Sequence, residues 1–311
     1  MRSPSSSLAN WGLFLLLAFI WGSSFILMKE GLLQLTAFEV ASIRIVASGL
    51  ILLPVALRAF REIPQNKIIY AFLSGVLGSL LPAYLFCLAE VKVDSALAGT
   101  LNSLTPIFVI VAGVSFFKQV ISKQKIIGIL IAFAGSALLL LSKKTVEGFQ
   151  HLPEVSMIVI ATIMYGVNVN MVHRHLKQFP AIQVVSIALV LCSIPALIVL
   201  FAGNFHHHTF NNAVAYSIGA AAVLGIFGTS LASILFYKLI NRAGVVFASM
   251  VTYGIPFVAN FWGVVYGEQI GWIDVICMII ILAGVYVANR PGRIAKITTA
   301  GKAQGRAGES I

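Results

Sequence analysis

Ten continuous apolar runs, separated by short polar segments, most limit what this chain can fold into. An α-helix needs about 20 residues to cross the ~30 Å hydrocarbon core of a bilayer. Runs of that length exclude a transmembrane β-barrel, whose strands are about half as long and alternate between apolar and polar residues. The sequence therefore predicts an all-α integral membrane protein with ten transmembrane helices. The runs are residues 11–28, 38–57, 68–88, 95–117, 126–141, 155–172, 182–202, 214–239, 245–266 and 272–289.

Composition supports this class of protein. Hydrophobic residues make up 59% of the chain and charged residues only 10%, whereas soluble domains are about 25% charged. The net charge of +11 comes without a basic stripe with interleaved aromatic residues, so nucleic acid is not an expected partner. Cys87, Cys192 and Cys277 each lie inside an apolar run, where cysteine behaves as a small core residue. Neither a disulfide framework nor a metal cluster is expected.

The basic residues lie in alternate loops, and this pattern predicts the orientation of the helices. Cytoplasmic loops carry an excess of Lys and Arg. With the N-terminus inside, 16 of the 21 basic residues lie in inner segments, four lie in outer segments and Arg44 lies within the second run. Eight of the ten acidic residues lie outside. A miscounted helix would invert every later loop, so we expect both termini in the cytoplasm and a multi-pass protein of the cell (plasma) membrane, such as a bacterial inner membrane.

The stretch 71–118 recurs at 221–268. A shift of 150 positions without a gap gives ten identities in 48 positions, and the glycine and proline matches are the informative ones. An internal repeat constrains the whole fold. Five helices in each half is an odd number, so equivalent helices cross the membrane in opposite directions and the predicted repeats are inverted. Inverted repeats with interrupted helices indicate a substrate site at the membrane midplane and alternating access by rocking of the halves.

This pattern divides the chain into five expected parts. A cytoplasmic N-terminal segment and an external linker flank the first five-helix repeat, and a basic cytoplasmic tail follows the second repeat. In chain order the parts are residues 1–10, 11–142, 143–154, 155–289 and 290–311.

Small and polar residues recur on one face of the two proline-interrupted runs. Asn102 and Pro106 share a face of the fourth run, and Thr252, Pro256 and Asn260 share the equivalent face of the ninth. Proline removes a backbone N–H and frees a carbonyl one turn earlier, which a membrane tolerates where the carbonyl faces water or substrate. We expect substrate contacts at the two asparagines and the threonine, and helix breaks at the prolines. Close helix packing, which uses the same residue types, is the alternative.

Two further runs carry aromatic and polar candidates at equivalent positions. Trp21 and Ser24 share a face of the first run, and Tyr165 and Asn168 are their counterparts in the sixth. Trp21 begins ten residues into its run, about 15 Å by helical rise, which is deeper than an interfacial aromatic belt. We expect all four side chains to contact substrate. The alternative is that the Trp21 side chain faces lipid.

Arg44 lies within the second run, and a charge inside a membrane indicates a functional site. We expect it to contact substrate. The alternatives are that it extends outward to the membrane surface or forms an ion pair with Glu39 or Glu90.

No pattern of residues indicates reaction chemistry. The chain has neither a His-Glu-x-x-His nor a Gly-x-Ser-x-Gly pattern. His206–His208 are consecutive residues of one loop and do not make a preorganised metal site. We therefore expect no catalytic residues, no bound metal and no cofactor. An intramembrane enzyme, or a membrane scaffold or receptor without transport activity, is the alternative to a carrier of small molecules.

Several of these patterns resemble the EamA-type branch of the drug/metabolite transporter superfamily. They are Phe-Ile-Trp-Gly-Ser-Ser-Phe around Trp21, Ser-Ile-Arg-Ile around Arg44, Leu-Thr-Pro106 and Gly-Ile-Pro256. The resemblance covers residues 11–290 and implies a ten-helix carrier that moves small metabolites, often by export, through a cavity between the halves. We expect an exporter of amino-acid-like or related compounds, embedded in the lipid bilayer. Whether it forms a homodimer is left open. The chain departs from the family at Lys118, where an acidic residue is usual.

The charge pattern makes a direct prediction of topology. A reporter fused after Arg290 should lie in the cytoplasm, and one inserted near His207 should lie outside, because basic loops stay on the inner side. Reporter activity specific to each side measures both positions. The opposite pair of locations would contradict the ten-helix arrangement.

Overall fold

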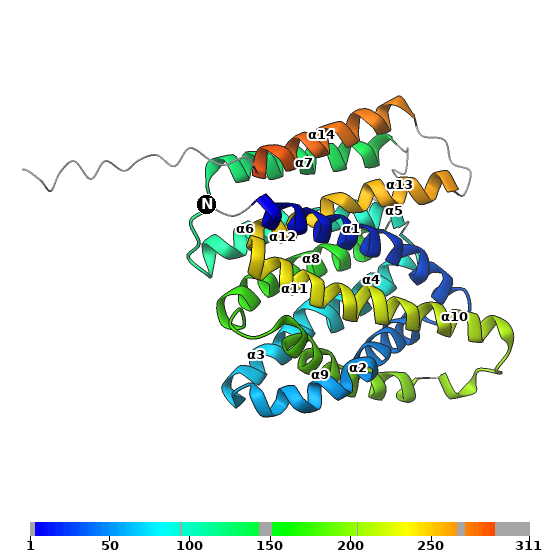
Figure 1. Ribbon diagram of the computed structural model, residues 1–311. Helices are drawn as coiled ribbons and strands as arrows, with labels where there is room; N and C mark the ends of the chain where they lie inside the picture. The colour runs from blue at the N-terminus through cyan, green and yellow to red at the C-terminus, as the bar shows by residue number, and fades with distance from the viewer. Residues whose placement is uncertain (1–3, 94, 143–150, 204, 266–270, 290–311) are drawn as a thin grey trace, which may run out of the picture.

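Helices make up all the regular secondary structure that this computed structural model describes, over residues 4–93, 95–142, 151–203, 205–265 and 271–289 (Figure 1). The all-α prediction is confirmed for these residues. Most of the expected external linker, at 143–150, and the basic tail at 290–311 lie outside them. We call residues 4–142 the N-terminal half and 151–289 the C-terminal half.

The first two helices are long and regular. They are α1 (Pro4–Leu32) and α2 (Ala37–Glu62). Thr36 and Glu39 form a capping box at the start of α2: the backbone N–H of each residue donates to the side chain of the other. These bonds satisfy two backbone donors that the first turn of a helix leaves open.

The third helix of each half contains a π-helical segment. A π segment shifts the backbone ladder from i→i−4 to i→i−5 and is frequent at functional sites. Gly225 in one of these segments packs so closely on α2 that a Cβ atom there would lie 2.3 Å from the Arg44 carbonyl oxygen. The N-terminal segments are α3 (Gln65–Gly75), η1 (Val76–Leu80) and α4 (Leu81–Glu90), and the C-terminal ones are α10 (Asn212–Val223), η4 (Leu224–Leu231) and α11 (Ala232–Ala243).

The fourth helix of each half is broken. Pro106 and Pro256 each occupy the second position of the helix after the break, where a missing backbone N–H leaves no hydrogen bond unmade. The N-terminal half has a turn at residues 103–104, and the C-terminal half has a 3₁₀ segment. The pieces are α5 (Ser95–Asn102) and α6 (Thr105–Ser115), then α12 (Val245–Ser249), η5 (Met250–Gly254) and α13 (Ile255–Val265).

The remaining helices are α7 (Lys123–Ser142), α8 (Leu152–His175), α9 (Ala181–Ala202), η3 (Phe205–His207) and α14 (Trp272–Asn289). Among the described residues, eight helical stretches are long and apolar enough to cross a membrane. The predicted fifth and ninth spans are not in that set: they correspond to α7 and to the broken stretch that begins at α12. The structure therefore describes a multi-pass membrane protein.

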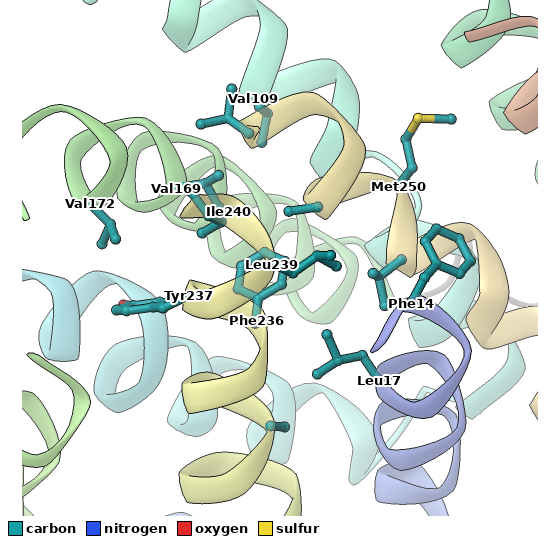
Figure 2. Close-up of a cluster of buried hydrophobic side chains, with 14 of the residues drawn as sticks. Phe14, Leu17, Val109, Val169, Val172, Phe236, Tyr237, Leu239, Ile240 and Met250 are labelled. Atoms are coloured by element: carbon teal, nitrogen blue, oxygen red, sulfur yellow. The ribbon is translucent and has the colours of Figure 1, made fainter. Parts of the chain in front are cut away.

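Buried apolar side chains form a continuous core around α11. Figure 2 shows Phe236, Leu239 and Ile240 of this helix between Phe14 and Leu17 of α1 and the valines of α8. All three cysteines are free and buried, as their apolar surroundings predicted. Many large apolar side chains on the outer faces of the helices are exposed instead, and a lipid environment would cover them.

The last helices of the two halves, α7 and α14, lie against each other at the edge of the bundle (Figure 1). Their contact depends on glycine. A Cβ atom on Gly284 would lie 2.3 Å from the backbone nitrogen of Ala132 and 2.6 Å from the carbonyl oxygen of Gly128. Gly128 meets the α14 backbone at the same distances. Small residues four positions apart allow such close approach of membrane helices.

Replacing Gly284 with Ala should lower the thermal unfolding temperature of the purified protein in detergent. The added methyl group would meet backbone atoms that cannot move aside, and such overpacking costs about 1–3 kcal/mol. Gly219→Ala is the matched control, because no atom lies within 4 Å of the position of its Cβ. Equal unfolding temperatures for the two variants would contradict this account of the α7–α14 contact.

Candidate functional site

A cavity of about 100 Å³ lies between the two halves of the chain. Its walls come from α1, α2, α5 and the π-containing helix of the N-terminal half, and from α8, the other π-containing helix and the 3₁₀ segment of the C-terminal half. One water molecule requires about 10–15 Å³ in this kind of measure. The cavity therefore has room for several waters or for a small organic molecule.

Seven of the eight predicted substrate residues line this cavity. They are Trp21, Ser24, Arg44, Asn102, Tyr165, Asn168 and Thr252. The eighth, Asn260, lies in α13, but its side chain is outside the described part of the chain. The structure therefore brings together residues from five separate helical stretches. That these side chains bind substrate stays a prediction.

Trp21 is fixed in the cavity wall by two contacts with the C-terminal half. Its Nε1 donates a hydrogen bond to the carbonyl oxygen of Gly228 over 3.1 Å. Its ring also meets Phe236 edge to face, with 5.0 Å between the ring centroids, which is a favourable aromatic geometry. Trp21 is therefore oriented toward the cavity and the π-helical segment η4.

Arg44 is also directed to the C-terminal half. Its Nε donates to Thr229 Oγ1 over 2.6 Å. Neither predicted acidic partner receives a hydrogen bond from Arg44. Glu39 accepts from Thr36 and bonds to His208 instead, and both carboxylate oxygens of Glu90 are buried without a hydrogen-bond partner. Arg44 is the one Arg, Lys, Asp or Glu among the described residues that line the cavity.

A buried polar contact in the cavity wall joins Asn168 of α8 to Tyr237 of α11, both in the C-terminal half. The Asn168 Nδ2 group donates to the Tyr237 hydroxyl over 3.2 Å, while its Oδ1 atom is buried without a partner. A Cβ atom on Gly78 would lie 2.2 Å from Asn168 Nδ2. Glycine at this point of η1 therefore makes room for the amide, and the unpaired oxygen leaves an acceptor close to the cavity.

The broken helices contribute hydroxyl and amide groups. Thr105 Oγ1 donates to Asn102 Oδ1 over 3.2 Å, and Thr252 Oγ1 donates to the Ser249 carbonyl oxygen over 3.0 Å. Both bonds stay within one proline-interrupted helix. The hydroxyl oxygens keep their acceptor capacity for a molecule in the cavity.

The cavity lining has an internal pairing. Of the 21 described residues that line it, 16 form eight pairs in which the members lie 144 or 150 positions apart in the sequence. Each pair joins one residue of the N-terminal half to one of the C-terminal half. The pairs are Trp21/Tyr165, Ser24/Asn168, Phe25/Val169, Gly78/Gly228, Ser79/Thr229, Phe86/Phe236, Asn102/Thr252 and Thr105/Ile255.

Sequence reasoning missed some of these residues although their signal was present. Ser79, Thr229, Phe86 and Phe236 all lie inside the repeated stretch, at matched positions. Following every matched pair, rather than the polar rows beside the prolines, would have found them. Tyr237 had no such signal, since Cys87 occupies its matched position.

Comparison with known proteins agrees with the geometry. The model of the EamA-like transporter family matches residues 10–141 and again residues 152–290. An uncharacterized transporter of Archaeoglobus fulgidus is 24% identical over 288 residues, which cover 90% of this chain and 99% of that protein. An uncharacterized transporter of Synechocystis is 22% identical and covers 88% and 87% of the two chains.

Two further comparisons extend over most of the chain. A WAT1-related chloroplastic protein of Arabidopsis thaliana is 24% identical over 298 residues, covering 91% of this chain and 70% of that protein. One crystal structure superposes with a TM-score of 0.68 at 17% identity, over 93% of this chain and 98% of its own. The superposition shows a shared fold.

Accessibility of the cavity to water can be measured by thiol labelling. We expect Ser233→Cys to react with a small water-soluble thiol reagent, because Ser233 lines the cavity. The native cysteines are buried and should stay unreactive. Ser186→Cys is the matched control, because Ser186 is fully buried in α9 away from the cavity. Equal labelling rates at the two positions would contradict a water-accessible cavity.

Proposed function

We propose, from the premise that this chain belongs to the EamA-like transporter family, that it carries a small metabolite through the cavity between its halves. The family and the relatives named as transporters make the protein a membrane transporter and not an enzyme. The observation that supports the route is the paired lining of the cavity. A pathway built from equivalent positions of two related halves is the arrangement that many secondary carriers use.

The proposed architecture is ten membrane-crossing helices in two inverted repeats, with both termini in the cytoplasm. The two matches to the family model, the matched π segments and the matched breaks support the repeats, which we place at residues 11–142 and 155–289. The segregation of basic and acidic loops supports the orientation and a cell (plasma) membrane location.

The proposed mechanism is alternating access by rocking of one half against the other. Support comes from the hydrogen bonds that join the two halves at the cavity, Trp21–Gly228 and Arg44–Thr229. The π segments and helix breaks at the cavity are points where a helix can bend.

The cavity chemistry favours a compact substrate that has both polar and apolar parts. Arg44 can pair with a carboxylate, and the amides and hydroxyls of Asn102, Asn168 and Thr252 can bind uncharged polar groups. The rings of Trp21 and Phe236 offer an apolar surface. These groups suit an amino-acid-like metabolite, and we propose that the protein exports such compounds.

Flux through liposomes that contain only the purified protein tests this proposal. Comparing metabolites inside and outside cells, with and without overexpression, identifies the substrate to load. A carrier then moves that substrate across the liposome membrane. A scaffold or receptor without transport activity gives no flux above empty liposomes, and that result would overturn the proposed function.

Thr252→Val should reduce flux roughly tenfold, because a substrate polar group left without its partner costs about 1–3 kcal/mol. Thr162→Val is the matched control. Both threonines are buried and donate to the carbonyl oxygen three residues earlier, but only Thr252 lines the cavity. Equal flux in the two variants, at equal protein levels, would assign Thr252 to helix packing.

A further inference from the structure

A second hollow, with a volume of about 460 Å³, lies at the end of the bundle where α8 ends and α12 begins. Its walls are the segment after α6, the start of α7, the end of α8 and the junction of α11 with α12. Figure 1 draws α6, α8, α11 and α12 close together, and α12 contacts the other three. None of its described lining residues also lines the central cavity.

The charged side chains among the described lining residues of this hollow are all basic. Lys125, Arg174 and Lys177 line it, and no Asp or Glu is among its described lining residues. The three cations are exposed, and the ion pairs found among the described residues, Lys92–Glu154 and His208–Glu39, do not involve them. Their positive charge is therefore not balanced by a bonded carboxylate.

Two further features of the hollow favour the binding of a ligand. The Arg174 guanidinium lies over the ring of Phe117, with its Cζ atom 5.9 Å from the ring centroid, and this cation–π contact limits where the charge can move. His173 also lines the hollow, and its Nδ1 atom is buried without a hydrogen-bond partner. A ligand that reaches this atom would satisfy a polar group that the protein leaves unpaired.

Apolar residues line the hollow beside its three cations. Phe117 and Ile121 line one side, and the run from Val245 to Phe247 lines the other. Val120, which also lines the hollow, is fully exposed at 101%. Basic pockets at the cytoplasmic ends of membrane helices bind phospholipid headgroups, and apolar walls next to the cations suit the acyl chains of the same molecule.

We propose that this hollow binds a phosphate-bearing anion, and that its occupant in the membrane is the headgroup of an anionic phospholipid. The site lies at the end of the bundle that the charge pattern assigns to the cytoplasm. Lys125 belongs to the N-terminal half, whereas Arg174 and Lys177 belong to the C-terminal half, so a phosphate bound by these cations would link the two halves. The binding site does not rest on the proposed transport function.

Lipid retention measured by native mass spectrometry tests the proposal. The full chain is purified in detergent and titrated with phosphatidylglycerol or phosphatidylcholine. We expect the wild type to retain phosphatidylglycerol preferentially, and Arg174→Gln/Lys177→Gln to lower its apparent affinity roughly 10- to 30-fold, because each basic residue near an anionic surface contributes about a fivefold factor. The matched control is Arg58→Gln/Arg61→Gln, which removes two exposed cations from the same predicted side, outside the hollow.

The outcomes separate the sources of phosphate. A loss of phosphatidylglycerol in the hollow variant alone supports the lipid site. Calorimetric titration with pyrophosphate that shows binding to the wild type and not to the variant, without selective lipid retention, keeps the anion site but overturns the lipid as its occupant. Equal affinities in all proteins, or an equal loss in both double variants, overturn the proposal. If the double variant does not elute as a folded protein, Lys125→Gln provides the same comparison, because Lys125 is an exposed side chain at the start of α7.

Discussion

Every backbone polar group inside a bilayer must find a partner within the protein, and the rest of this structure depends on that constraint. Most of the chain meets it with regular α-helix. Among the described residues, two π segments and two proline-linked breaks depart from the regular α-helix, and each of the four contributes residues to the central cavity. Irregular backbone is tolerated at membrane depth where it is enclosed by protein or lines a cavity. The irregular segments therefore border the cavity for one physical reason, which is that backbone polar groups inside the bilayer need partners.

Glycine allows these irregular segments to approach their neighbours closely. Gly225 and Gly228 bring η4 against α2 and α1, and Gly78 brings η1 against Asn168. Close approach shortens the distances at which Trp21 and Arg44 reach their partners in η4. The same residue type joins α7 to α14 through Gly128 and Gly284. Glycine therefore allows close packing both in the cavity wall and between α7 and α14.

The two hollows differ in their electrostatics, and this difference separates their proposed ligands. The central cavity has one cationic residue, Arg44, among uncharged polar and aromatic groups, which suits a small molecule that must also leave. The second hollow has three exposed cations and apolar lining residues beside them, which suits a resident lipid. Segments of both halves form each hollow, so a ligand in either one would act on the contact between the halves.

The sequence by itself determined the membrane class, the all-α fold and the identity of seven residues that line the cavity, because apolar run length and residue spacing are local properties. Trp21, Asn102 and Asn168 could be selected from one helix at a time. Only the tertiary structure decided their partners: Trp21 bonds to a residue 207 positions away and Arg44 to one 185 positions away. It also decided the π segments and left the Glu90 carboxylate without a hydrogen bond from Arg44. Periodicity assigns a residue to a face of its own helix, whereas packing between distant helices decides what that face meets.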